Sequence, residues 1–135
     1  MKVAVITGPR QSELQEVPNP KVRENFVLVR IEVAPMCTEY KGYKEGWASN
    51  VLGHEAAGEV VEVAQPGQVK VGDRVVVMPQ FPCGLCKLCL AGDYIHCEDC
   101  VDPLAICGSK TGLGTYAEYC IKQDWLCLPV PEEMS

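Results

Sequence analysis

Residues 56–77 read AAGEVVEVAQPGQVKVGDRVVV, the clearest structural pattern in the chain. Two runs rich in valine, 56–63 and 73–77, lie on either side of 65–73, which carries two turn signals, Pro-Gly and Gly-Asp. β-Branched residues favour strands, whereas Gly, Pro and Asp favour turns. The pattern therefore predicts two β-strands, the second folded back beside the first.

Three further stretches have the same character, and they lie at 2–6, 27–33 and 115–121. Each is short, rich in β-branched residues or alternating in hydrophobicity, and bounded by residues that favour turns, which is typical of strands. No long helical period is present, and only 37–46 and 83–92 are expected to form brief helical turns. The chain is therefore predicted to be mainly β.

The bulk composition indicates one globular domain. A chain of 135 residues is about one domain long, and 47% hydrophobic with 22% charged residues is typical of folded globular proteins. The net charge is −6 and the basic residues are scattered. Because nucleic-acid-binding proteins cluster Lys and Arg against the phosphates, no nucleic-acid partner is expected.

The two ends of the chain carry different signals. The N-terminal apolar run is broken by Gly8-Pro9 and is too short for a signal peptide or a membrane span, so we expect a cytoplasmic protein with no membrane attachment. The C-terminal stretch 125–135, WLCLPVPEEMS, ends in acidic residues that suit the first turn of a helix. This end therefore predicts that a longer protein continues beyond the chain.

The chain has nine cysteines, and four of them lie within 83–97, CGLCKLCLAGDYIHC. In a reducing compartment such a cluster indicates a metal site more than a disulfide framework, and the odd total leaves one cysteine unpaired in any all-disulfide scheme. Four thiolates suit Zn²⁺ in a closed, structural site. The expected ligands, in a lobe at about 81–100, are Cys83, Cys86, Cys89 and Cys97.

Alternatives to this assignment exist within the same stretch. His96 and Cys100 flank Cys97 closely enough to replace it as the fourth ligand. Buried apolar cysteines or redox thiols are a second interpretation, since CxxC also occurs in thioredoxin-like motifs. The cysteines in apolar surroundings are expected to pack in the core, and these are Cys107, Cys120 and Cys127.

A second pair of candidate ligands lies earlier in the chain. Cys37 is in APMCTEY at 34–40, and His54 is in VLGHEAAGEV at 51–60, each in a loop next to an expected strand. A lone cysteine is more often a core residue, and a lone histidine is more often hydrogen-bonded without a metal. Neither residue alone therefore indicates a site.

Taken together, the motifs resemble the N-terminal catalytic domain of zinc-dependent medium-chain alcohol dehydrogenases. The motifs that carry the resemblance are, in chain order, Cys37, Gly53-His54-Glu55, VGDRVVV at 71–77, the four cysteines of 83–97, and GTYAEY at 114–119. The resemblance implies a GroES-like, partly open β-barrel over residues 1–135, with a small zinc-binding lobe. It also implies a following Rossmann domain that binds NAD or NADP, and a homo-oligomer at full length.

The resemblance further implies a catalytic zinc held by Cys37, His54 and Glu55, with the remaining ligand supplied from beyond this chain. A zinc ion with an open position is a Lewis acid that favours the alkoxide form of a bound alcohol. The implied reaction is hydride transfer from a small alcohol to the nicotinamide, giving an aldehyde or ketone.

The residues after Cys37 depart from the family pattern. Relatives place a Ser or Thr two residues after the cysteine and an Asp after that, whereas this chain reads Cys37-Thr38-Glu39-Tyr40. The hydroxyl that relays the alcohol proton is Thr38 by residue type, with Glu39 and Tyr40 as alternatives. The carrier of the proton is left open among these three side chains.

Two other functional interpretations remain beside the dehydrogenase. The chain would be a non-catalytic zinc-binding module if only the lobe binds metal, or a relative of the reductases that lack most of the zinc. The stretch GLGTYA at 112–117 matches a dinucleotide-binding fingerprint, but a strand-like segment follows it where that fingerprint needs a helix. We therefore expect a turn into a strand there.

Overall fold

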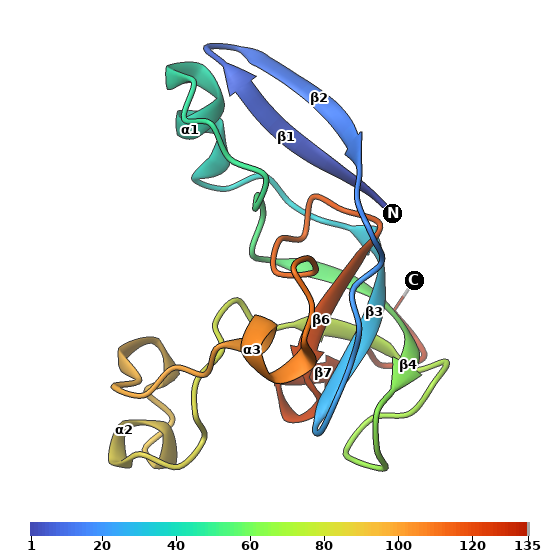
Figure 1. Ribbon diagram of the computed structural model, residues 1–135. Helices are drawn as coiled ribbons and strands as arrows, with labels where there is room; N and C mark the ends of the chain where they lie inside the picture. Colours follow the sequence, from blue (N-terminus) through green and yellow to red (C-terminus); the bar gives the residue numbers. More distant parts are fainter. Residues whose placement is uncertain (135) are drawn as a thin grey trace.

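The computed structural model describes residues 1–134, and its centre is a five-stranded antiparallel sheet with the order β6-β3-β4-β5-β7 (Figure 1). Its strands are β3 (Phe26–Val33), β4 (Ala56–Val63), β5 (Arg74–Val77), β6 (Tyr119–Gln123) and β7 (Cys127–Pro129). The sheet ends at two edge strands, β6 and β7, so it is an open sheet and not a closed barrel. The mainly β expectation is confirmed.

Strands β4 and β5 pair as the pattern in 56–77 predicts. Ala56 lies opposite Val77 in an antiparallel register. Alternate side chains of a strand point to one face, and Val60 and Val75 on that face are fully buried. These valines form one core cluster with valines of β3 and with one cysteine each from β6 and β7.

A β-hairpin stands apart from this sheet, beside the first helix (Figure 1). It consists of β1 (Lys2–Gly8) and β2 (Gln11–Glu16), with Arg10 at φ 58° in the turn. A single β-bridge from Val3 to Ala117 connects the hairpin to the segment before β6. Every residue of β2 is exposed, so no apolar pattern predicted this strand, which forms through backbone pairing with β1.

The strand expected at 115–121 begins later than predicted. β6 starts at Tyr119, while the residues before it form bends around the bridge to β1. Thr115 is buried there, and its hydroxyl donates to the backbone carbonyl of Glu55 at 2.9 Å. Alternating side chains indicate extended backbone but do not reveal which stretch finds a partner strand, so the start of the strand was wrong.

Helices in this fold are short. They are α1 (Glu39–Glu45), α2 (Lys87–Leu90), α3 (Pro103–Cys107) and the 3-10 turns η1 (Tyr94–His96) and η2 (Asp124–Leu126). The first two fall inside the segments expected to form helical turns. The sequence-based prediction lacks α3, although Asp102 caps it by accepting the N–H groups of Leu104 and Ala105. None of the helices in residues 1–134 has the length and apolar character that crossing a membrane requires.

A second core cluster lies where β3 and β6 meet α3. Its buried members are Phe26, Leu28, Cys107 and Ile121. Phe81 and Val101, at the two ends of the cysteine-rich segment, pack against this cluster. Cys107, Cys120 and Cys127 are at most 3% exposed, which confirms their expected place in the core.

Candidate functional site

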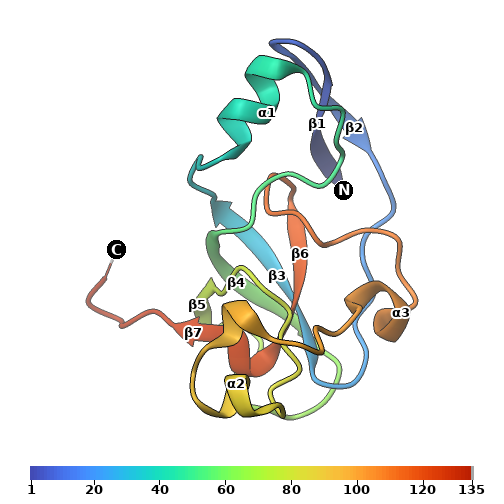
Figure 2. The same ribbon diagram turned by 90° about the vertical axis from the view of Figure 1, so that its left-hand side faces the viewer.

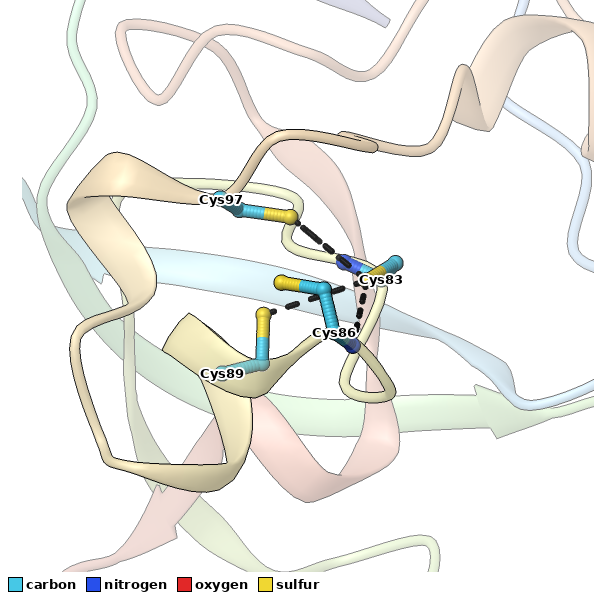
Figure 3. Close-up of side chains that lie close together, drawn as sticks. All are labelled: Cys83, Cys86, Cys89 and Cys97. Atoms are coloured by element: carbon cyan, nitrogen blue, oxygen red, sulfur yellow. Dashed lines mark hydrogen bonds between the residues drawn. The ribbon is translucent and has the colours of Figure 1, made fainter.

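Residues 81–100 leave the sheet after β5 and form a lobe around α2 that projects to one side (Figures 1 and 2). Four sulfur atoms meet inside it, from Cys83, Cys86, Cys89 and Cys97, all within 4.8 Å of one another (Figure 3). The Sγ atom of Cys83 lies 3.9 Å from that of Cys89 and 3.6 Å from that of Cys97.

These spacings fit one tetrahedrally coordinated ion. Four sulfurs at zinc–sulfur distances of about 2.3 Å lie about 3.8 Å apart. Disulfide sulfurs are only about 2.05 Å apart, and all nine cysteines of the chain are free thiols. Because four sulfurs complete the coordination of zinc, a site of this kind leaves no position for water or substrate and is structural.

Backbone groups within the lobe hold the sulfurs in place. Gly84 adopts φ 76°, and this tight turn brings the N–H groups of Leu85 and Cys86 to 3.4 and 3.3 Å from the Sγ atom of Cys83. The N–H of Cys83 in turn donates to the Sγ atom of Cys97 at 3.3 Å. Hydrogen bonds from N–H groups stabilise thiolates, so the local turns favour the charged form that binds metal.

Three of the four thiols have shifted pKa values. A backbone hydrogen bond at Cys89 lowers the pKa of Cys86 to about 6, and a backbone hydrogen bond at Cys83 lowers the pKa of Cys97. Desolvation raises the pKa of Cys89 to about 12, a shift opposite in direction to those of Cys86 and Cys97. A divalent cation at the centre would remove this difference by favouring all four thiolates together.

The two alternatives to Cys97 lie outside the sulfur cluster. Cys100 is exposed and directs its thiol to the backbone carbonyl of Cys97 at 3.6 Å. His96 directs its Nδ1 atom to the carboxylate of Asp93 at 2.8 Å. The geometry therefore brings together the four cysteines proposed from the sequence.

The second candidate site lies where the loop before α1 meets the loop before β4. Glu39 links the two loops: one carboxylate oxygen lies 2.8 Å from Nδ1 of His54, and the other accepts the backbone N–H of Cys37 at 3.1 Å. The Glu39 side chain is 11% exposed, whereas that of His54 is 37% exposed. With Nδ1 bonded to the carboxylate, His54 presents Nε2 for a metal or a substrate.

The surroundings of Glu39 favour the ionised form of its carboxyl group. Burial alone would raise the pKa of this carboxyl, but backbone hydrogen bonds at Glu39 and Cys37 and the contact with His54 together lower it. An ionised carboxylate orients the imidazole and fixes its tautomer. From the sequence, Glu39 was only an alternative proton relay, because no local pattern links it to His54.

The other side chains proposed for catalysis are exposed. Thr38 is the exposed N-cap residue of α1, and its side chain makes no capping hydrogen bond. Tyr40 is 57% exposed. Glu55 is exposed at the start of β4, and its backbone carbonyl accepts the hydroxyl of Thr115.

The two candidate sites differ in how completely their ligands assemble. In residues 1–134, the lobe cysteines are the only group of three or more potential ligand atoms within 4.8 Å of one another. Cys37 and His54 are joined through Glu39. Glu55 does not form a group of three ligand atoms with Cys37 and His54 at that spacing. The second site therefore needs movement of these side chains, or a further ligand, to hold an ion.

The segment 112–117 forms a turn that leads to β6, as its position in the sequence predicts. Gly114 lies so close to the backbone of Leu52 that a side chain would place its Cβ atom 2.6 Å from the Leu52 carbonyl oxygen. Gly53 adopts φ 79° directly before His54. Gly53 and Gly114 allow the loop before β4 to pack closely on residues 112–117. This packing explains the glycines of GLGTYA without a bound nucleotide.

Comparison with a known protein family gives one match that covers most of the chain. The profile of the Alcohol dehydrogenase GroES-like domain matches residues 23–132. This range contains both candidate metal sites.

Several of the proteins that this chain resembles are dehydrogenases. The sorbitol dehydrogenase of Bacillus subtilis is 31% identical over the whole chain, which covers 40% of that protein. The alcohol dehydrogenase of Geobacillus stearothermophilus is 37% identical over 89% of the chain and 37% of its own length. Among solved structures, zinc-dependent alcohol dehydrogenase 2 from Streptococcus pneumonia is 30% identical with a TM-score of 0.76, and the match covers all of this chain and 40% of that one.

Proposed function

Because the chain belongs to the zinc-type medium-chain alcohol dehydrogenase family, we propose that it is the substrate- and zinc-binding domain of an NAD- or NADP-dependent dehydrogenase. The reaction would oxidise a small alcohol to an aldehyde or ketone. The chain spans about 40% of the length of the relatives it matches. The nicotinamide cofactor would therefore bind to a Rossmann domain outside these residues.

One observation carries this proposal beyond family membership. The carboxylate of Glu39 contacts both Cys37 and His54, which come from different loops. His96 contacts Asp93 in the same way, but that pair is exposed and only three positions apart, whereas the largely buried Glu39 connects His54 to Cys37 of a different loop. This arrangement is the one that prepares an imidazole to bind a metal ion.

Two zinc ions are proposed for the domain. One, with a structural role, would be held by the four cysteines of the lobe, about residues 81–100 of a domain that comprises 1–135. The other would be held by Cys37, His54 and Glu55 together with a ligand from outside the chain. When bound, an ion with an open position supplies Lewis-acid chemistry that favours an alkoxide.

The chain's own residues would orient the site and move a proton. Glu39 fixes the tautomer and orientation of His54 through the 2.8 Å contact. The hydroxyl of the exposed Thr38 is the first choice for accepting the alcohol proton, with Glu39 and Tyr40 as alternatives. A cytoplasmic location and a homo-oligomeric full-length protein are further parts of the proposal.

A non-catalytic zinc-binding module is the second candidate function. One observation favours it: within residues 1–134, only the lobe brings together a full set of metal ligands. This candidate predicts one zinc ion per chain and no role for His54.

Zinc content and activity of the longer protein that includes this chain separate the two candidates. His54→Ala should remove one of two zinc ions and lower kcat/KM for alcohols by about 10³-fold or more, because loss of a ligand removes the Lewis acid. His96→Ala is the matched control, since His96 is an exposed histidine outside both ligand sets. A longer wild-type protein with one zinc ion and no alcohol oxidation would refute the dehydrogenase proposal, and a His54→Ala protein with full activity and unchanged zinc content would refute the proposed role of His54.

A further inference from the structure

Side chains that lie outside the lobe hold the segment through which it leaves the sheet. Lys122 and Gln123, at the end of β6, are each only 3% exposed. Such burial is rare for these residue types unless they are paired. Both side chains reach residues 80–82, the segment that leads directly to the first lobe cysteine.

Lys122 contacts this segment in two ways. Its ammonium group donates to the backbone carbonyl of Gln80 at 3.1 Å and lies 3.5 Å from the centre of the Phe81 ring. A carbonyl oxygen and an aromatic face both stabilise a cation, and they replace part of the water that burial removes. The two contacts fix the position of the backbone and of one side chain in the same segment.

Gln123 contacts the backbone carbonyl of Pro82, two residues after the carbonyl that Lys122 contacts. Its Nε2 atom donates to the carbonyl of Pro82 at 3.0 Å, and this bond joins residues 41 positions apart. In residues 1–134, the Oε1 atom of the same amide is buried with no hydrogen-bond partner. A buried oxygen without a hydrogen bond destabilises the fold. Any stabilisation by this amide therefore comes from the bond between its Nε2 atom and Pro82.

Trp125 contacts the lobe itself. Its ring meets the ring of Tyr94 edge to face, with centres 5.5 Å apart at an angle of 66°. A Cβ atom placed on Gly84 would lie 3.2 Å from the same indole ring, so the turn after Cys83 packs directly on it. Trp125 therefore contacts both the first and the last part of the ligand-bearing stretch.

The lobe has little else to order it. Three of its large apolar side chains are exposed: Leu85 is 82% exposed, Leu90 is 76% exposed and Ile95 is 67% exposed. Its helix α2 has four residues. A segment with so little buried apolar surface does not fold by its own packing, so its order has to come from a metal ion and from contacts with the sheet.

We propose that Lys122, Gln123 and Trp125 are positioning residues of the cysteine site, which set its metal affinity although none of them is a ligand. Their contacts at residues 80–84 place Cys83, to which Leu85, Cys86 and Cys97 are hydrogen-bonded. Removing a contact would leave the four sulfurs with more freedom before the metal binds. The entropy of ordering them would then lower the affinity. This proposal rests on the metal binding by the lobe proposed above.

The test is titration of the metal-free 135-residue chain with Co²⁺, whose visible spectrum reports tetrahedral thiolate coordination. Gln123→Met removes the donor to Pro82 and keeps the approximate volume, and we expect its Co²⁺ affinity to fall about 10- to 100-fold, the range seen for partners that orient metal ligands. Lys122→Arg keeps a cation and a donor, so it should retain affinity that Lys122→Met loses.

Val60→Ala is the matched control, because Val60 is fully buried in the sheet core and is not a lobe residue. It should lower the unfolding temperature and leave the Co²⁺ affinity within about twofold, whereas a purely structural role for Gln123 would make the two variants alike. Unchanged affinity in Gln123→Met, or an equal loss in Val60→Ala, would overturn the positioning role. If Gln123→Met does not fold, equal affinities of Lys122→Arg and Lys122→Met would overturn it instead.

A wild-type chain that takes up no Co²⁺ would overturn the metal assignment of the lobe, and the positioning role with it. Co²⁺ binding by the wild type with unaffected variants would leave the proposed dehydrogenase function standing. The two failures are therefore distinguishable.

Discussion

The cysteine lobe and the Cys37–His54 site are built in opposite ways. The lobe draws all four sulfurs from residues 83–97, and its own backbone N–H groups arrange them. The second site draws its residues from two loops and depends on the carboxylate of Glu39 to connect them. The lobe brings all four of its ligands together within this chain, whereas the second site needs a further ligand or movement of its side chains.

This difference has a physical origin. Ligands that are close in sequence pay a small loop-closure cost, so a few turns and one ion can order them. Ligands from separate loops meet only when the packing of the domain brings the loops together. A site that exchanges substrate must also keep an open position, which a complete set of four thiolates excludes.

The largest expected effect comes from removing a lobe ligand. Cys89→Ser should abolish zinc binding by the lobe and lower the free energy of unfolding by ~4 kcal/mol, the stabilisation that a ligand gives at 1,000 times its Kd. Atomic spectroscopy and thermal denaturation of the 135-residue chain measure both quantities. Cys100→Ser, an exposed cysteine of the same lobe outside the sulfur cluster, should change neither. Equal behaviour of the two variants would contradict the ligand assignment.

A smaller effect concerns the charge buried under the lobe. Burial lowers the pKa of Lys122 to about 8 from its ordinary 10.5, while its buried neighbours Cys120 and Cys127 have pKa values raised to about 12. Between pH 8 and 10.5 the unfolded chain binds more protons at this lysine than the folded chain. The contribution of Lys122 to the free energy of unfolding should therefore rise with pH across this window, by at most ~3 kcal/mol.

The measurement is the difference in unfolding free energy between wild type and Lys122→Met, followed from pH 7 to 10.5 at constant metal concentration. The thiols of the lobe titrate in both proteins and cancel in the difference. The pKa values of Cys120 and Cys127 are raised only in the folded state, so these thiols contribute with the opposite sign, but they are common to both proteins and also cancel. A difference that does not change with pH would mean that Lys122 keeps its ordinary pKa in the fold.

The smallest effect is expected at the other site. Glu39→Gln removes the charge beside His54, and we expect the metal affinity of this site to fall about tenfold, or ~1.4 kcal/mol. The readout is Co²⁺ titration of the longer protein after zinc has filled the lobe. Glu32→Gln is the control, since Glu32 is an exposed acid that lies 3.6 Å from Arg30. A loss of lobe zinc in Glu39→Gln would show that the two sites are not independent.

Most of the strands could be predicted from the sequence, and the elements that were missed have different causes. β1, β3, β4 and β5 bury one or both faces, so their residues show β-branched or alternating patterns. β2 is exposed along its whole length and has no such pattern. α3 has only five residues, although its Asp102-Pro103 start is a recognisable helix signal.

By itself, the sequence determined the features that depend on neighbouring residues: the β4–β5 pair, the short helical turns, and the four-cysteine set. In each case one continuous stretch with a recognisable pattern, such as 56–77 or 83–97, contains all the residues that form the structure. Only the tertiary structure decided that Glu39 binds His54 and that β6 anchors the lobe through Lys122 and Gln123. Those contacts join residues 15, 42 and 41 positions apart, and their partners are chosen by the packing of the whole sheet, which no local pattern encodes.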